Sequence, residues 1–255
     1  MNNMRLLKAL GCAVIVSFLL SAAALADIAV GPLTKTIEAA PGGAQTLIYK
    51  VANNADKPVN INVSAKTWFS LPENAAIDIG QWLKLGVEKL TLAPKEEKEL
   101  KFEVVVPKQA KGELASMIYF TPEREEGQML GTSYGVSLYV FVKGTEVVNP
   151  QIGAVSLSKK DGIFYIAVTI ENKGNVHFRP RVNAIIKIGK DIKENIVLPF
   201  GKPIFGGQDY NFVQKIEKQL PSEGDCEIEI LCNYGNSADT IIKKSQAFNL
   251  GEVKE

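Results

Sequence analysis

The chain has 255 residues, with 29 basic and 28 acidic side chains and a formal net charge of +1 at pH 7. So balanced a charge leaves no excess of positive charge to bind nucleic acid or an anionic membrane surface, and both are excluded as partners. The length is enough for two domains of about 100 residues each once a leader is removed. No second long apolar run follows the N-terminal one, so we expect no stable membrane span in the mature chain.

The N-terminus carries the pattern of an export signal. Two basic residues precede an apolar run over residues 9–22, and Ala24-Leu25-Ala26 gives the small-x-small motif that signal peptidase cuts. We therefore predict a signal peptide over residues 1–26 and a mature chain that begins at Asp27. The alternative is an uncleaved membrane anchor, but the apolar run is short for a span, which needs about 20 residues.

Short runs in which apolar and polar residues alternate dominate the first half of the mature chain, which is typical of half-buried strands. They are bounded by Gly, Pro and Asn, the residues that punctuate turns. The runs cover residues 46–51, 59–65, 100–106, 114–120 and 136–142. One short turn or helix is expected near Ile79–Leu85, because helical periodicity is weak elsewhere after the signal.

A second series of such runs follows Asn149-Pro150. These runs cover residues 164–170, 182–188, 196–198, 210–213, 226–232 and 247–250. About seven short strands in each half, separated by turn signals, are typical of a β-sandwich. In a sandwich one face of each strand packs against the other sheet, which explains why one face of each run is apolar.

The two halves repeat a pattern of turn residues. Asn53 and Asn172 each end a run and precede a proline that opens the next run, and Gly112 and Gly224 each stand before an acidic residue and a further run. The paired positions are 119 and 112 residues apart. Such similar offsets indicate two copies of one plan.

The sequence thus predicts an all-β chain of two tandem immunoglobulin-like β-sandwich domains after the signal peptide. We place the first domain at residues 27–148 and the second at residues 149–255. Their boundary falls in the stretch from Gly144 to Gly153, between the two series of runs.

The mature chain has two cysteines, Cys226 and Cys232, six residues apart on one alternating run. At about 3.3 Å per residue, two positions six apart on a strand are separated by roughly 20 Å. A disulfide needs Cα atoms within about 7 Å, so we predict none. The cysteines share an apolar face and are expected to act as small core residues.

The sequence offers little material for catalysis. His177 is the only histidine, and neither a Gly-x-Ser-x-Gly motif nor a phosphate-binding glycine loop is present. The charge run over residues 123–126 is expected to be a solvated loop. We therefore predict a non-enzyme without a metal site or cofactor, with His177 at a turn or at the domain interface.

Several short motifs follow one another in an order that resembles the N-terminal domain of the periplasmic pilus-chaperone (PapD-like) family. In that family an aromatic strand leads to a Leu-x-Leu-x-Pro turn, a strand that ends in Val-Pro, and a Gly-Glu corner. The matching segments here are Trp82-Leu83-Lys84-Leu85, Leu90-Thr91-Leu92-Ala93-Pro94, Val104-Val105-Val106-Pro107 and Gly112-Glu113. The second half, around Asn172 to Pro180, resembles the immunoglobulin-like domains that follow such modules in exported surface-assembly proteins.

The resemblance implies that an exported subunit, a pilin-like or other surface protein, is held by strand donation. In this family the last strand of the first domain pairs with the client and inserts alternate apolar side chains into its open groove. Here that strand is predicted at residues 136–142, with Val136, Leu138, Val140 and Val142 on one face. The strand is apolar on both faces near its end, which is unusual for an exposed edge. An ordinary buried last strand is the alternative.

The chain departs from the usher-dependent members of that family. Those members hold the client's C-terminal carboxylate with a basic pair, through charge-assisted contacts. Lys35 and Lys143 are the possible carboxylate anchors in this sequence, and the loop over residues 121–134 is charged rather than apolar. The resemblance therefore implies a divergent relative that supports some other surface structure.

Two functions remain open at this stage. The first is a periplasmic chaperone-like assembly factor that binds a pilus or surface-structure subunit by β-strand addition. The alternative is a structural or adhesive module of a secreted or cell-surface complex. A glycan-binding role would rest only on Trp68, Phe69 and Trp82, which a sandwich core can equally use.

Overall fold

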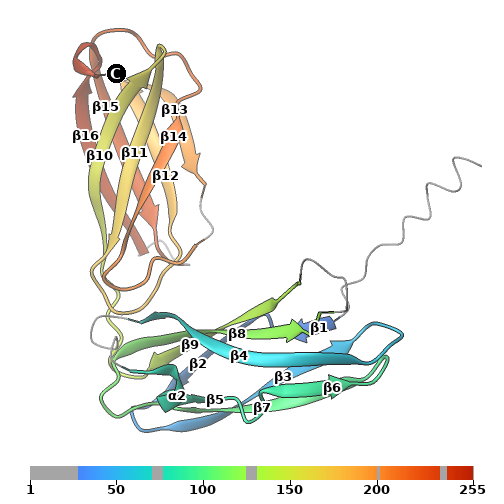
Figure 1. Cartoon of the computed structure of the whole chain (residues 1–255). Helices are drawn as coiled ribbons and strands as arrows, with labels where there is room; N and C mark the ends of the chain where they lie inside the picture. Colours follow the sequence, from blue (N-terminus) through green and yellow to red (C-terminus); the bar gives the residue numbers. More distant parts are fainter. Residues whose placement is uncertain (1–27, 71–76, 125–130, 200–201, 236–239, 255) are drawn as a thin grey trace, which may run out of the picture.

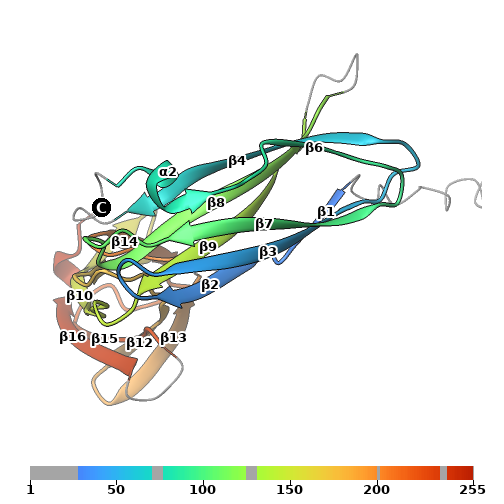
Figure 2. The ribbon, with the colours of Figure 1, turned by 90° about the horizontal axis from the view of Figure 1, so that it is seen from below.

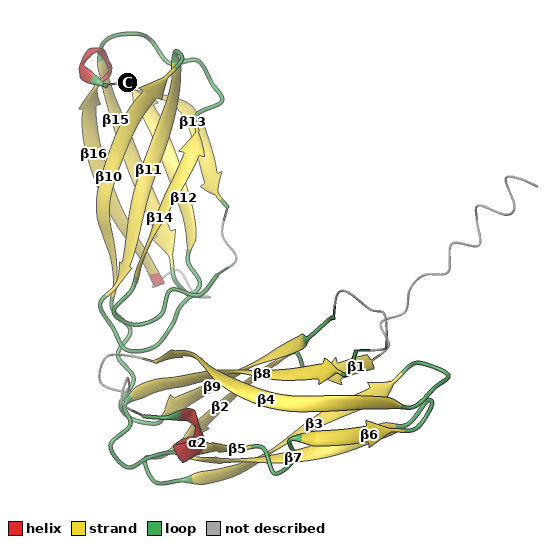
Figure 3. Cartoon of the chain, viewed as in Figure 1, coloured by secondary structure: helices red, strands yellow, loops and turns green. Residues whose placement is uncertain are grey.

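The computed structural model describes residues 28–70, 77–124, 131–199, 202–235 and 240–254. The predicted signal peptide and its cleavage position lie outside these ranges. Within them, no helix has the length and apolar character that a membrane span requires. Strands dominate the described backbone, and the all-β prediction is confirmed (Figure 3).

The first domain is a sandwich of two sheets. Alternation of apolar and polar residues gives each sheet one buried face, and these faces enclose a single core from Ile28 to Val142. One sheet has the order β1 (Ile28–Gly31), β3 (Ala44–Asn53), β7 (Glu97–Val105), β5 (Leu83–Lys84). The other has the order β2 (Thr34–Ala39), β9 (Tyr134–Val142), β8 (Gly112–Pro122), β4 (Val59–Ser70), β6 (Lys89–Leu92). The expected short helix is present as α2 (Ile79–Trp82).

The second domain is a separate sandwich with its own core, which runs from Phe164 to Leu250. One sheet has the order β10 (Pro150–Lys160), β11 (Ile163–Asn172), β14 (Asp209–Lys215). The other has the order β13 (Asp191–Leu198), β12 (Arg181–Ile188), β15 (Asp225–Asn233), β16 (Ile241–Asn249), after which the short helix η3 (Leu250–Glu252) ends the chain's regular structure. The two immunoglobulin-like sandwiches are thus as predicted, while the boundary at Asn149 stays a prediction.

A buried asparagine marks the same place in both domains. Asn53 ends β3, and its amide group donates to the carbonyl oxygens of Leu92 (3.2 Å) and Ala93 (2.9 Å). Asn172 ends β11, and its amide donates to the carbonyl oxygen of Ile204 (2.9 Å). In each case the side-chain oxygen accepts the backbone N–H two residues further on. Each asparagine therefore satisfies loop groups that would otherwise be buried without partners, and the repeat seen in the sequence has a physical basis.

The cysteines are placed as the sequence predicted. Cys226 and Cys232 are both free and buried on β15, facing the second core. Burial raises the pKa of both thiols, that of Cys232 to about 12. They are packing residues rather than reactive ones.

The two domains differ in what their first strand does. In the first domain the chain breaks at Gly31-Pro32, and β2 crosses to the other sheet, where it pairs in parallel with β9 (Figure 2). In the second domain β10 remains in one sheet, and the last strand β16 pairs only with β15. The last strand is therefore internal in the first domain and an edge in the second.

The domains meet at one end of the first domain and form an elbow (Figure 1). Strands β8, β9 and β4 lie on the side of the first domain nearer the second, while β3, β5 and β7 lie on the far side. The part of the five-stranded sheet formed by β9, β8 and β4 thus faces the inside of the elbow.

Candidate partner-binding site

The four predicted donor residues point into the first domain. Val136, Leu138, Val140 and Val142 are fully buried on the inner face of β9 and belong to the first core. They pack against the opposite sheet because they alternate in phase with the inner residues of β8. Their side chains are not displayed to a partner in the free chain, and their part in strand donation stays a prediction.

The backbone edge of β9 is also largely occupied. On one side β9 pairs with β8 along its whole length. On the other side it pairs with β2, in a parallel register that runs from Thr34 opposite Ser137 to Ala39 opposite Val142. The prediction that residues 136–142 form an exposed edge did not take β2 into account, which crosses from the other sheet to pair with β9.

The second apolar face of β9 has a different explanation from the one the sequence suggested. Tyr139 and Phe141 point outward, toward the second domain. Their rings lie against His177, with centroid distances of 4.4 and 5.9 Å, and Tyr139 also lies 6.3 Å from the ring of Phe205. The strand is apolar on both faces because it lies between the first core and the domain junction.

One part of β9 remains open. Among the described residues, pairing with the β2 side begins where the backbone N–H of Ser137 donates to the carbonyl of Leu33 (2.9 Å). Tyr134, Gly135 and Val136 precede that bond and have no register partner on this side. Leu33 is 69% exposed at this point, and of the large hydrophobic residues described in the first domain it is the most exposed. An unpaired backbone segment and an exposed apolar side chain therefore lie together.

The two lysines proposed as carboxylate anchors are not brought together. Lys35 lies opposite Leu138, whereas Lys143 follows the last pair of the ladder, five positions further along β9. At about 3.3 Å per residue this separates their backbone positions by roughly 16 Å, and their joint role as carboxylate anchors stays a prediction.

Lys35 has a structural role of its own. It is on the inward-facing side of β2, and its ammonium donates to the carbonyl of Ile48 on β3 (3.4 Å) and lies 5.8 Å from the ring centroid of Tyr49. It thus bridges the gap between the two sheets at their open side. A lysine has the same role in the second domain, where Lys244 on β16 donates to the carbonyl of Gly153 on β10.

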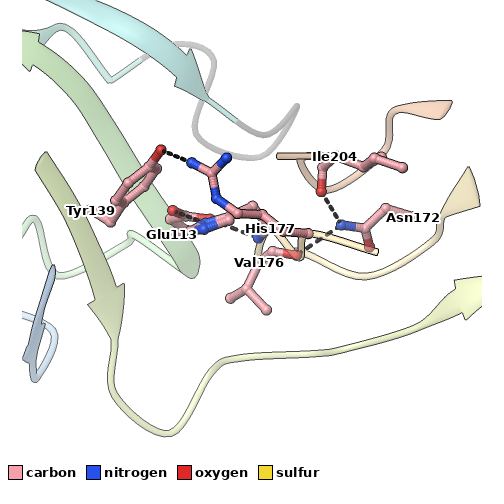
Figure 4. A network of polar contacts seen from close by, with 7 residues as sticks. Glu113, Tyr139, Asn172, Val176, His177 and Ile204 are labelled. Carbon is pink, nitrogen blue, oxygen red and sulfur yellow. Dashed lines mark hydrogen bonds and ion pairs between the residues drawn. The ribbon is translucent and has the colours of Figure 1, made fainter. Parts of the chain in front are cut away.

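A buried carboxylate connects the domains at the elbow. Glu113 on β8 is 3% exposed and accepts two hydrogen bonds from His177 of the second domain (Figure 4). Its Oε2 accepts the backbone N–H at 2.8 Å, and its Oε1 lies 2.7 Å from Nδ1 of the ring. The expectation that His177 lies at the domain interface is correct. The importance of Glu113 was missed, although an acidic residue at the head of an apolar run was a visible signal.

Tyr139 and Arg179 add a second polar contact at the junction. The guanidinium of Arg179 donates to the Tyr139 hydroxyl at 3.2 Å (Figure 4). Burial raises the pKa of Tyr139, while the neighbouring Arg179 opposes that rise. The hydroxyl therefore remains neutral and acts as a hydrogen-bonding group.

The linker between β9 and β10, residues 143–149, is held by the hydrogen bonds of two side chains. Thr145 accepts the backbone N–H of Gly112 and donates to the carbonyl of Val142, both at 2.7 Å. Asn175 accepts the backbone N–H of Val147 (2.6 Å) and donates to the carbonyl of Thr145 (2.9 Å). With the Glu113 contacts, these bonds hold the linker and both domains in one arrangement.

The described part of the chain holds no group of three or more His, Cys, Asp or Glu side chains that could bind a metal ion. What the site offers is a hydrogen-bonded elbow and a short open stretch of strand edge. Such features suit recognition of a protein chain through its backbone.

No protein-family model matches the chain, and no curated protein matches it in sequence. Its fold does match solved structures. The class 5 fimbriae chaperone CfaA is 12% identical, with a TM-score of 0.50, over 86% of this chain and 98% of that chain. A chain of the Salmonella enterica SafA pilin–SafB chaperone complex is 12% identical over 89% and 99%, with a TM-score of 0.43. The E. coli chaperone DraB is 14% identical over 89% and 96%, with a TM-score of 0.40. At such identities the likeness concerns the fold, and the chain has the two-domain, PapD-like fold of the periplasmic fimbrial chaperones.

Proposed function

We propose that the mature chain is a non-enzymatic, periplasmic chaperone-like assembly factor that binds an exported subunit of a pilus or other surface structure by β-strand addition. The observation that carries this proposal is the open edge of β9 at Tyr134–Val136, with Leu33 exposed beside it. An added strand would pair with this backbone while Leu33 contacts an apolar side chain of the partner.

The fold supports the proposal. The fimbriae chaperone CfaA matches this fold over 98% of its own length. The elbow supports it as well, because the hydrogen bonds of Glu113 and Asn175 keep β8, β9 and β4 on the side of the first domain nearer the second. A preorganised surface costs less conformational entropy on binding than a mobile one.

The test is site-specific photo-crosslinking in the cell that makes the protein. A photoreactive amino acid replaces Leu33, beside the open edge, and in a matched control it replaces Val213, which is 60% exposed on β14 of the second domain. We expect a crosslink from position 33 to one exported β-rich protein, mapped by mass spectrometry to an edge strand, and little or none from position 213.

Two results would contradict the proposal. Equal crosslinking from both positions would mean that the open edge is not the contact. Stable recovery of the chain in an extracellular filament or envelope complex, instead of a transient periplasmic complex, would favour the structural or adhesive module.

A further inference from the structure

The open edge of β9 is too short to hold a partner strand by itself. Among the residues described, Tyr134, Gly135 and Val136 of β9 have no register partner on the β2 side, and of these Gly135 alone turns its backbone N–H and carbonyl toward that side, because successive residues alternate sides. Strands that pair stably usually have about five or six residues. The rest of that edge, from Ser137 to Val142, is covered by β2. A partner strand of ordinary length could pair with β9 only if β2 gave up its place.

β2 is weakly held compared with the strand on the other side of β9. Of its six residues only Ala39 is buried, and Lys35 and Ile37 are half-buried, while Thr34, Thr36 and Glu38 are exposed. By contrast, seven of the eleven residues of β8 are buried. Parallel pairing is also slightly less stable per residue than antiparallel pairing. Segments with few buried apolar contacts open at the lowest free energies.

Few hydrogen bonds that involve side chains hold β2 in place, and they lie near the surface. The Lys35 ammonium reaches the Ile48 carbonyl at 3.4 Å, and the Gln45 side chain donates to the Glu38 carbonyl at 2.6 Å. The hydroxyls of Thr34 and Ser137, 3.3 Å apart, link β2 to β9 on the exposed face. Water can replace each of these exposed bonds at little cost.

The second domain provides an internal comparison. It is a sandwich of the same kind, yet among its described residues no strand covers the outer edge of its last strand, β16, which forms a sheet edge. A sandwich of this plan therefore does not need such a cover to fold. The crossing strand is an addition to the plan in the first domain, where it covers the edge of β9.

We propose that β2 is a displaceable strap, which covers the β9 edge in the free chain and detaches so that an extended strand of the exported partner can pair along β9 from Tyr134 to Val142. This inference rests on the proposed function for the identity of the partner. The detachment itself is a property of the free chain. Covering the edge prevents pairing with unselected strands until a partner competes for it.

The first experiment needs no partner. Residue-resolved hydrogen exchange by NMR on the mature chain compares amides on the two sides of β9. The amides of Ser137 and Lys143 donate to Leu33 and Ala39, whereas those of Leu138 and Val140 point toward β8 because successive residues alternate sides. We expect exchange at Ser137 and Lys143 to be faster by about tenfold or more. The variant Ile37→Ser, which removes an apolar contact of β2, should increase the difference. Equal exchange on both sides would overturn the inference.

The second experiment locks the strap. Thr34→Cys with Ser137→Cys places two thiols where the hydroxyl oxygens are 3.3 Å apart, and the native cysteines are buried on β15. Partner crosslinking from position 33 should fall about tenfold or more in the oxidised double variant and return on reduction, with each single variant as control. Undiminished crosslinking in the oxidised form would overturn the strap and leave the proposed function standing. Absence of a partner in every form would overturn the proposed function, while the exchange measurement would still decide whether β2 detaches.

Discussion

Glu113 of the first domain and His177 of the second are joined by two hydrogen bonds, although they are 64 residues apart in sequence. The carboxylate is buried, and the imidazole is enclosed by Tyr139, Phe141 and Phe205. A carboxylate in such surroundings is tolerated only when its oxygens are paired. The elbow angle therefore depends on this contact.

We expect Glu113→Ala to destabilise the chain by about 1–3 kcal/mol, because it leaves two donors of His177 without their acceptor in a buried junction. Urea unfolding would measure the loss, and small-angle X-ray scattering would detect a wider distribution of domain angles. The control is Glu97→Ala, whose exposed ion pair with Lys50 should contribute little to stability. An unchanged scattering profile for Glu113→Ala would show that the contact does not set the angle.

Gly112 is a second determinant of the junction. It has φ of +69°, and a Cβ at this position would lie 2.3 Å from the backbone oxygen of Asn175. Gly112→Ala should therefore disturb the elbow in addition to straining the backbone. Gly144 is a matched control, since its φ is +81° and a Cβ there would meet nothing within 4 Å. We expect Gly144→Ala to cost only the backbone strain, roughly 1–2 kcal/mol, and Gly112→Ala to cost clearly more in thermal unfolding.

The buried asparagines should stabilise their own domains independently. Asn53→Ala removes the donor to Leu92 and Ala93 in the first domain, and Asn172→Ala removes the donor to Ile204 in the second. Each change should cost about 1–3 kcal/mol, measured by chemical denaturation with a fluorescence probe in each domain. The exposed Asn62 provides a control whose replacement by Ala should have little effect. Equal loss in both domains from either single change would contradict this independence.

The two thiols should be unreactive in the folded mature chain. Burial raises the pKa of Cys226 and raises that of Cys232 to about 12, so the thiolate is scarce at pH 8. Labelling with a thiol reagent at that pH should be slow without urea and should reach two groups per chain in urea. Because the folded pKa of Cys232 exceeds the unfolded value of about 8.5, its contribution to stability is complete below that pH and declines as pH rises toward 12. Rapid labelling of the folded chain would show that β15 opens readily.

Much of the fold could be predicted because the alternation of apolar and polar residues within a strand indicates which of its side chains are buried. The alternation in residues 164–170 and 226–232 is the alternation of β11 and β15, and the Asn53 and Asn172 turns identify the repeat. One strand that the pattern missed, β2, lacks an apolar stripe. β2 has only Ile37 and Ala39 as apolar residues, so nothing local distinguishes it from a loop.

The site was harder to predict because it depends on contacts between distant segments. A period-two pattern indicates that Val136 and Leu138 share a face, but it does not indicate what covers the strand's edge. The parallel pairing with β2 joins residues about 100 positions apart. Likewise, the outward Tyr139 and Phe141 resembled an exposed apolar face, since the sequence does not tell which surface the second domain covers.

The lysines that bridge the sheet gaps, Lys35 and Lys244, have a consequence for the behaviour of the protein at high concentration. Each places a charge on the inward side of a strand at a sheet edge, and an incoming strand would have to bury or displace that charge. Two sandwiches with several edge strands would otherwise tend to join edge to edge into oligomers. The same side chains that close the sandwiches should therefore keep the chain monodisperse and discourage fibrous aggregates.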